Sequence, residues 1–273
     1  MKRIPIYILF LLPFLSFAQE KLKGNKQVTV ESRAINNFNK IEVIDNLEVL
    51  LTSNNQQSVS VEADSNLQEA IITTVEDGVL TIKTAGRIVK NKALKIHLNV
   101  DNNLLQINTY NNAKVLSETI VNIDSLYIEA FDNSDIDLKL NAKSVIIRAK
   151  KNTNLSFNIL TEFFNVYSEE NAKIRGNINT KDASIELLDR SNMDIDGVTN
   201  SLTLEANGTS IFKGKSFVSN TSKVTLSNKA STYINTSKNI EILARNNAEV
   251  YIYNAPKITL TEFFDKAAIY KRE

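Results

Sequence analysis

Residues 145–155 read VIIRAKKNTNL and residues 164–174 read FNVYSEENAKI, so one pattern returns after 19 residues. Each of these two copies has eleven residues. Position 1 of the pattern is apolar, position 3 is aliphatic and position 5 is small. Position 8 is polar and often Asn, position 9 is small and position 11 is apolar. Working outward from these two copies, nine copies begin at Leu105, Leu126, Val145, Phe164, Ala183, Leu202, Val224, Ile240 and Ile258. The starts lie 21, 19, 19, 19, 19, 22, 16 and 18 residues apart, and the ninth copy carries one extra residue before Asp265.

Two columns of the repeat are apolar in each of the first eight copies. The third position is Ile107, Ile128, Ile147, Val166, Ile185, Leu204, Leu226 and Ile242. The eleventh position is Val115, Ile136, Leu155, Ile174, Met193, Phe212, Ile234 and Val250. Such regularity identifies a true internal repeat of a length typical of solenoids.

Within each copy, apolar and polar residues alternate with a period of two, as in Asp135–Leu140, which is typical of strands. Stacking identical units then produces parallel, in-register sheets around an apolar core. The sequence predicts an all-β fold, a parallel β-helix or β-solenoid of about 19-residue coils over residues 105–273.

One polar column of the repeat contains Asn112, Asn133, Asn152, Asn171 and Asn247. Asn tolerates left-handed backbone angles, so we expect these residues to turn the corners of a chain that has only 7 Gly. Stacked side-chain amides also hydrogen-bond along such ladders. A row of Asn side chains that contacts a ligand is the alternative interpretation.

The region before the repeats is irregular. Residues 19–27 are polar and predicted to be loose, and residues 28–104 are predicted to be an N-terminal β cap or the first distorted coils. Strands are expected at 28–32, 41–44, 47–51, 58–62, 79–83 and 94–100. Asp64 opens a candidate short helix.

The first 18 residues have the layout of a secretory signal peptide. A positive start is followed by twelve apolar residues from Ile4 to Leu15, then by the small residues Ser16 and Ala18. Cleavage would remove Lys2 and Arg3 and leave 255 residues with 30 basic and 31 acidic side chains. We therefore expect an exported protein, in the periplasm or on the cell surface, with no transmembrane segment after cleavage.

Composition excludes several classes of function. The chain has no Cys, which excludes disulfides, cysteine–zinc sites and thiol catalysis. The balance of 32 basic and 31 acidic residues lacks the basic excess of nucleic-acid binders. No Trp is present, and the aromatic residues at exposed positions, Tyr127, Phe131 and Tyr167, are scattered, so no aromatic sugar platform is expected.

Three sets of residues are candidates for chemistry. His97 is the only histidine, and it lacks a Ser or Asp motif that would make it a catalytic base. Asp189, Asp194 and Asp196 resemble the opening of a calcium loop, but Thr203 occupies the closing position. Asp132, Asp135 and Asp137 are acidic residues of the kind that cleave polysaccharides on β-helices. We expect no catalytic, metal or cofactor site, with calcium binding by the Asp189 set left open.

The runs Phe38–Val43, Val59–Asn66 and Asp77–Ile82 resemble the start of the family called putative auto-transporter adhesin, head GIN domain (DUF2807). The resemblance extends over roughly residues 33–256. It implies an exported β-helical adhesin. Together with the repeat, it predicts a non-enzymatic cell-envelope protein that presents its surface to an envelope or extracellular protein or glycan. A β-helix carbohydrate-active enzyme and a purely structural envelope or periplasmic protein are the alternatives.

Overall fold

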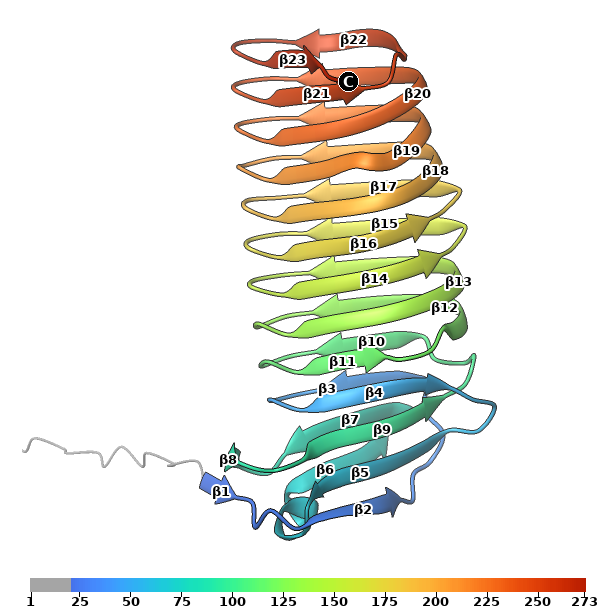
Figure 1. The fold of residues 1–273 in the computed structure, drawn as a ribbon, viewed down its shortest axis with the longest axis vertical. Helices are drawn as coiled ribbons and strands as arrows, with labels where there is room; N and C mark the ends of the chain where they lie inside the picture. The colour runs from blue at the N-terminus through green and yellow to red at the C-terminus, as the bar shows by residue number, and fades with distance from the viewer. Residues whose placement is uncertain (1–20) are drawn as a thin grey trace, which may run out of the picture.

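The computed structural model describes residues 21–273, and the predicted signal peptide lies outside this range. The described chain winds into a flattened parallel β-solenoid, as the sequence predicts, with a cap at its N-terminal end (Figure 1). No helix among the described residues is long or apolar enough to cross a membrane.

Each coil contributes one strand to each of two facing sheets. The first sheet contains β3 (Lys40–Val43), β7 (Val79–Thr84), β10 (Gln106–Thr109), β15 (Phe163–Ser168), β17 (Asp182–Leu187) and β22 (Lys257–Phe263). The second sheet, nearer the viewer in Figure 1, contains β4 (Glu48–Ser53), β9 (Leu94–Val100), β11 (Lys114–Ser117), β14 (Asn154–Leu160), β16 (Lys173–Asn179), β21 (Glu249–Tyr253) and β23 (Ala268–Lys271).

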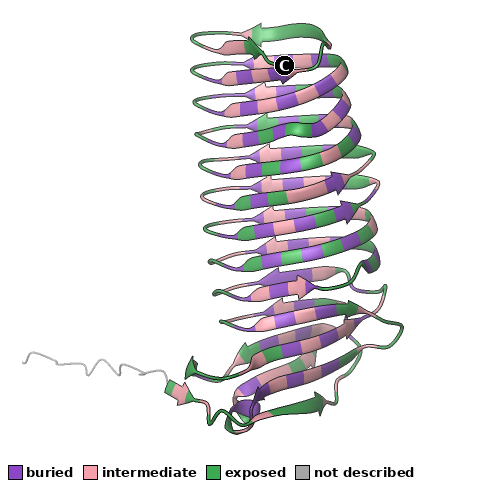
Figure 2. Cartoon of the chain, in the orientation of Figure 1, coloured by how far each residue is buried: buried purple, intermediate pink, exposed green. Residues whose placement is uncertain are grey.

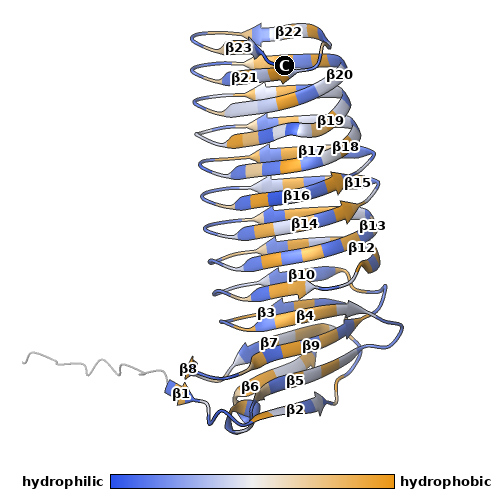
Figure 3. Cartoon of the chain, viewed as in Figure 1, coloured by the Kyte–Doolittle hydropathy of each residue, from blue (hydrophilic) through white to orange (hydrophobic). Residues whose placement is uncertain are grey.

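A tight turn joins the two sheets on one side of each coil, and a wider arc joins successive coils on the other side. Five long strands curve through the arc from the second sheet to the first: β12 (Val121–Ala130), β13 (Asp135–Ala149), β18 (Asn192–Ala206), β19 (Ile211–Leu226) and β20 (Ser231–Ala244). Burial and hydropathy alternate along the strands, so one side chain in two enters the core (Figures 2 and 3).

The strand register confirms the repeat and corrects one copy. Ile147 pairs with Val166 and Ile185 with Leu204, as the third-position column requires. However, Leu204 pairs with Val224, and Val224 pairs with Ile242. The seventh copy therefore begins at Ser222, two residues earlier than the sequence suggested. The eleventh position of this copy is Thr232, which is fully buried, and not Ile234.

The left-handed corner lies one residue before the predicted Asn column. Positive φ angles of 55–77° occur at the seventh position of all nine copies: Asn111, Asp132, Lys151, Glu170, Asp189, Gly208, Asn228, Asn246 and Asp265. Asn112 and Asn133 share this conformation, whereas Asn152, Asn171 and Asn247 do not. The prediction is therefore wrong for three of the five Asn residues.

The predicted amide ladder is confirmed for three of the five Asn residues, Asn133, Asn152 and Asn171. The Nδ2 group of Asn152 donates to Oδ1 of Asn133 at 3.0 Å, and that of Asn171 donates to Asn152 at 3.0 Å. Arg190 ends the ladder by donating from Nε to Asn171 at 2.7 Å. These bonds link neighbouring coils and occupy the amides, which argues against the alternative of a ligand-binding row.

The N-terminal region combines coils and a cap. β3 and β4 pair in parallel with β10 and β11, and β7 and β9 pair in parallel with β3 and β4. Residues 40–53 are therefore stacked between residues 79–100 and 106–117. Beneath them, β5 (Ser58–Asp64) and β6 (Ile71–Glu76) run antiparallel to β9 and β7, and β2 (Val28–Arg33) runs antiparallel to β5. The antiparallel strands end the coil stack and cover its core.

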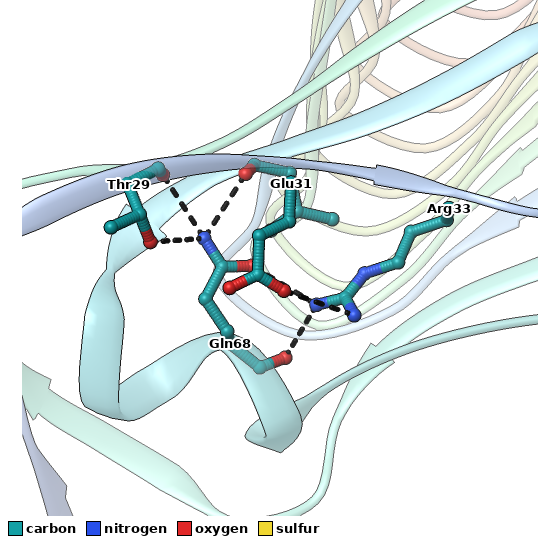
Figure 4. A network of polar contacts seen from close by, with 5 residues as sticks. Thr29, Glu31, Arg33 and Gln68 are labelled. Atoms are coloured by element: carbon teal, nitrogen blue, oxygen red, sulfur yellow. Dashed lines mark hydrogen bonds and ion pairs between the residues drawn. The ribbon is translucent and has the colours of Figure 1, made fainter.

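The predicted short helix is a 3-10 helix, η1 (Ser65–Ala70), held under the cap by a polar network (Figure 4). Gln68 is buried, and its Nε2 donates to the carbonyls of Thr29 and Val61. Arg33 donates to the side-chain oxygen of Gln68 at 3.0 Å and lies 3.4 Å from the carboxylate of Glu31. This network ties β2 to η1.

Within the segment predicted to be loose, Lys21–Lys23 forms β1, which pairs in parallel with β8 (Arg87–Lys90). The buried Asp64 fixes this corner, because its carboxylate accepts backbone N–H groups of Lys26, Lys92 and Ala93 at 2.7–3.1 Å. Burial acts to raise the pKa of Asp64, but these N–H groups outweigh it and hold the pKa below 3.8.

Because the pKa of Asp64 is lowered in the folded state, its stabilising contribution is present above the unfolded value of 3.8 and is lost as the pH falls below that value. We expect Asp64→Asn to be less stable than the unmodified chain at pH 7, with the gap narrowing below about pH 4. Urea unfolding at both pH values measures the gap. A gap that stays constant would contradict this role of the carboxylate.

Candidate binding surface

His97 lies in the cap, on β9. Its Nε2 is 2.8 Å from Oε2 of Glu62 on the neighbouring antiparallel strand β5. This contact makes His97 one half of a cross-strand pair. Glu62 is a carboxylate of the kind that orients a catalytic histidine, but no hydrogen bond within residues 21–273 joins His97 to a serine or threonine hydroxyl.

The three aspartates of the candidate calcium loop do not converge. Asp189 lies in a tight turn, whereas Asp194 and Asp196 point outward from β18. Asp194 is 3.9 Å from Nζ of Lys213, and Asp196 accepts a hydrogen bond from Asn177 at 2.9 Å. No group of three acidic or histidine side chains suited to a metal ion occurs within residues 21–273.

The second acidic set is also divided. Asp132 occupies a tight turn, where it forms an ion pair with Lys151 of the next coil. Asp135 accepts a hydrogen bond from Asn154 at 3.0 Å. Asp135 and Asp137, two residues apart on β13, both line an open hollow on the outer face of the second sheet.

Two adjacent hollows run along the outer face of the second sheet, which we call the groove face. The first, about 670 Å³, is lined by residues that include Asp137, Arg175, Asp194 and Lys213. The second, about 610 Å³, shares Asp194 and Lys213 and extends to Tyr233 and Tyr253. The hollows therefore form one trough that runs along the solenoid axis from β11 to β21.

A β-bulge in β19 shapes the second hollow. The coil from Leu202 to Ser222 has 20 residues, and the register shifts by one residue between Lys213 and Phe217. A Cβ atom on Gly214 would lie 2.4 Å from Cε1 of Phe212, so glycine leaves room for that buried ring. The extra residue emerges at Lys215 and Ser216, both exposed, and Asn235 donates to the carbonyl of Lys215 at 2.9 Å. Bulges of this kind redirect side chains beside functional sites.

Three tyrosines form a ladder beside the bulge. The ring centroids of Tyr233 and Tyr251 are 4.6 Å apart and those of Tyr251 and Tyr270 are 4.8 Å apart, with near-parallel planes. Tyr253 lies two residues along β21 from the ladder. The Tyr251 hydroxyl donates to Glu249 at 2.9 Å, and this bond, with burial, raises the pKa of Tyr251 above 10.0. The hydroxyl therefore remains a hydrogen-bond donor at neutral pH.

The ladder corrects the expectation that the aromatic residues are scattered. Tyr233, Tyr251 and Tyr270 occupy the twelfth position of the last three copies once the seventh copy starts at Ser222 and the extra residue of the ninth is discounted. With the start at Val224, Tyr233 falls in a different column. The misaligned copy concealed the ladder.

Two basic side chains rest on these rings. Nζ of Lys215 lies 5.0 Å from the ring centroid of Tyr253. The guanidinium of Arg272 lies 4.9 Å from the centroid of Tyr251 and 5.8 Å from that of Tyr270. Within the described part of the chain, neither cation is within 4.0 Å of a carboxylate oxygen.

Several cations of the other outer surfaces are held in ion pairs. On the first sheet, Arg148 pairs with Glu129 and Lys150 pairs with Glu169. The Tyr167 hydroxyl also donates to Glu169, and this bond and burial raise the pKa of Tyr167 to about 12. A hollow of about 710 Å³ along the arc contains Lys143 and Lys181, each within 3.3 Å of a carboxylate. On the first sheet, Lys223 and Lys257 line a further hollow of about 390 Å³ and form no ion pair within residues 21–273. What sets the groove face apart is that its cations Lys215 and Arg272, unpaired within the described chain, rest on tyrosine rings.

Solved structures share the fold. A putative lipid binding protein from Parabacteroides distasonis is 13% identical, with a TM-score of 0.66, covering 93% of this chain and all of that one. A putative adhesin from Parabacteroides merdae is 14% identical, with a TM-score of 0.64, covering 94% of this chain and all of that one. No protein of curated function matches the sequence.

A family model matches residues 37–162 and 152–256, which together span most of the solenoid and part of the cap. The names of the family and of these neighbours are those of adhesins and binding proteins. The chain belongs to the family described as putative auto-transporter adhesin, head GIN domain.

Proposed function

We propose that the chain is an exported, non-enzymatic adhesin of the cell envelope that binds a linear glycan along the groove face. The observation that carries the proposal is the trough with a tyrosine ladder and a bulge at one end. A trough that crosses several coils suits an extended polymer, and its mixture of aspartate, lysine, serine and tyrosine offers both donors and acceptors to sugar hydroxyls.

The alternatives find less support. A carbohydrate-active enzyme needs two carboxyl groups converging from opposite sides of one sugar bond. Asp132 lies apart in a turn, and Asp135 and Asp137 project from the same face of one strand, with Asp135 bound by Asn154. A lipid ligand, suggested by the name of one structural neighbour, would favour an apolar cavity, and both hollows are open and lined by charged residues.

The experiment measures binding of the purified chain to immobilised dextran, cello- and chito-oligosaccharides, hyaluronate and polygalacturonate, with collagen and fibronectin as protein probes. We expect at least one polysaccharide to bind, and Tyr253→Ala to weaken its binding about tenfold, equivalent to about 1.4 kcal/mol. Tyr127→Ala, on the first sheet, is the matched control and should bind normally. Binding to the protein probes alone would contradict the glycan assignment, and no binding to any probe would contradict adhesion through this face.

A further inference from the structure

We infer that the glycan is anionic and that Lys215 and Arg272 hold its acidic groups at the tyrosine end of the groove face. This inference rests on the proposed function and adds the chemical class of the ligand. A carboxylate or a sulfate ester is the group that these two side chains would recognise.

The first argument is that Lys215 and Arg272 contact aromatic rings and no carboxylate of the described chain. Lys215 projects from the bulge onto Tyr253, beside the ladder. Arg272 follows the last strand and lies on Tyr251 and Tyr270 of the ladder. Their contacts are with rings, at 4.9–5.8 Å, and not with carboxylates. A cation resting on an aromatic face keeps its hydrogen-bond donors available, and guanidinium groups suit planar oxyanions especially well.

The spacing of further cations along the trough is the second argument. Lys173 and Arg175 both line the first hollow, and neither forms an ion pair within residues 21–273. β16 lies two strands from β19 in the sheet, which places Arg175 and Lys215 on the order of 10 Å apart along the axis. Such spacing fits a polymer with a charge at intervals of a few sugar units.

The aspartates of the same face favour a glycan over a nucleic acid. Asp194 and Asp196 lie on β18, between Arg175 of β16 and Lys215 of β19, and Asp137 lines the same trough two strands beyond Arg175. A nucleic acid carries a phosphate on every nucleotide, so these carboxylates would repel it. A glycan with fewer charges can place neutral hydroxyl groups at the aspartates, which accept hydrogen bonds from them.

The test compares hyaluronate, which carries one carboxylate per disaccharide, with its fully methyl-esterified form, because the two polymers share a backbone and differ in charge. We expect the acid form to bind at least tenfold more tightly at low salt, and the advantage to shrink as salt is added. The double variant Lys215→Ala with Arg272→Ala should lose about tenfold in affinity for the acid form and leave binding of the ester unchanged. The control double variant Lys229→Ala with Arg245→Ala removes two cations of the tight turns.

Equal binding of the two forms would overturn the anionic inference while the proposed glycan function stands. An equal loss of affinity in the control double variant would also overturn the inference, since the loss would then reflect the overall positive charge of the protein and not these two side chains. Tighter binding of duplex DNA than of hyaluronate would replace the glycan with a nucleic acid. If no polysaccharide of the wider panel binds, the proposed function itself fails.

Discussion

Phe212→Ala is expected to lower the free energy of unfolding by about 3–5 kcal/mol. Phe212 is fully buried in the eleventh column of the repeat, next to Met193 and Thr232 in the register. Its ring fills the space beside Gly214, which has no side chain to move into the vacated volume. The parallel strands on either side are fixed by their hydrogen bonds, so the cavity should persist.

Urea unfolding followed by far-ultraviolet circular dichroism measures this cost. The control is Met193→Leu in the same column, a change of similar volume that should cost less than about 1.5 kcal/mol. A loss below about 1 kcal/mol for Phe212→Ala would show that the core at the bulge is loosely packed, and the packing explanation of the bulge would then be wrong.

Gly176→Ala is expected to cost about 3 kcal/mol, because it combines an unfavourable backbone conformation with overpacking. Gly176 has a φ of +149°, and a Cβ atom would lie 1.9 Å from the carbonyl oxygen of Phe157 in the neighbouring coil. The contact is with backbone, so no side-chain rotation relieves it. The two strands would have to separate locally.

The matched control is Asn158→Ala, an exposed residue of the same sheet in the adjacent coil, expected to change stability by less than about 0.5 kcal/mol. Thermal and urea unfolding of both variants provide the comparison. Equal stability of Gly176→Ala and the control would mean that β14 and β16 can move apart without cost, contrary to the register described here.

The solenoid was predictable because its signal repeats. The columns through Ile147 and Leu155 specify inward positions in two sheets, and stacking follows from their equal spacing. The error at the seventh copy has a physical cause. A shift of two residues keeps every side chain on its own face, so Ser222 and Val224 are equally acceptable starts to a pattern of period two. Hydrogen-bond register separates them, and alternation does not.

The cap and the groove face were less predictable. The stacking of residues 40–53 between 79–100 and 106–117 depends on pairing between distant strands, which hydropathy does not encode. The bulge depends on how Phe212 and Gly214 share space inside the coil. In the sequence, Lys215 looks like any charged residue on the solvent side of a strand. The bulge places its ammonium group over the ring of Tyr253. Both aspartate sets are visible in the sequence. In each set, however, one aspartate (Asp132 or Asp189) lies in a tight turn and the other two lie on a strand.

The most direct test of the central claim, that the groove face binds a glycan, is hydroxyl-radical footprinting of tyrosines with the tightest-binding polysaccharide of the panel. Tyr233, Tyr251, Tyr253 and Tyr270 report on the groove face, and Tyr127 and Tyr167 report on the opposite sheet. We predict that the polysaccharide protects the first four and leaves the other two unchanged. Protection of Tyr127 and Tyr167, with the ladder labelled as in the free protein, would contradict the account.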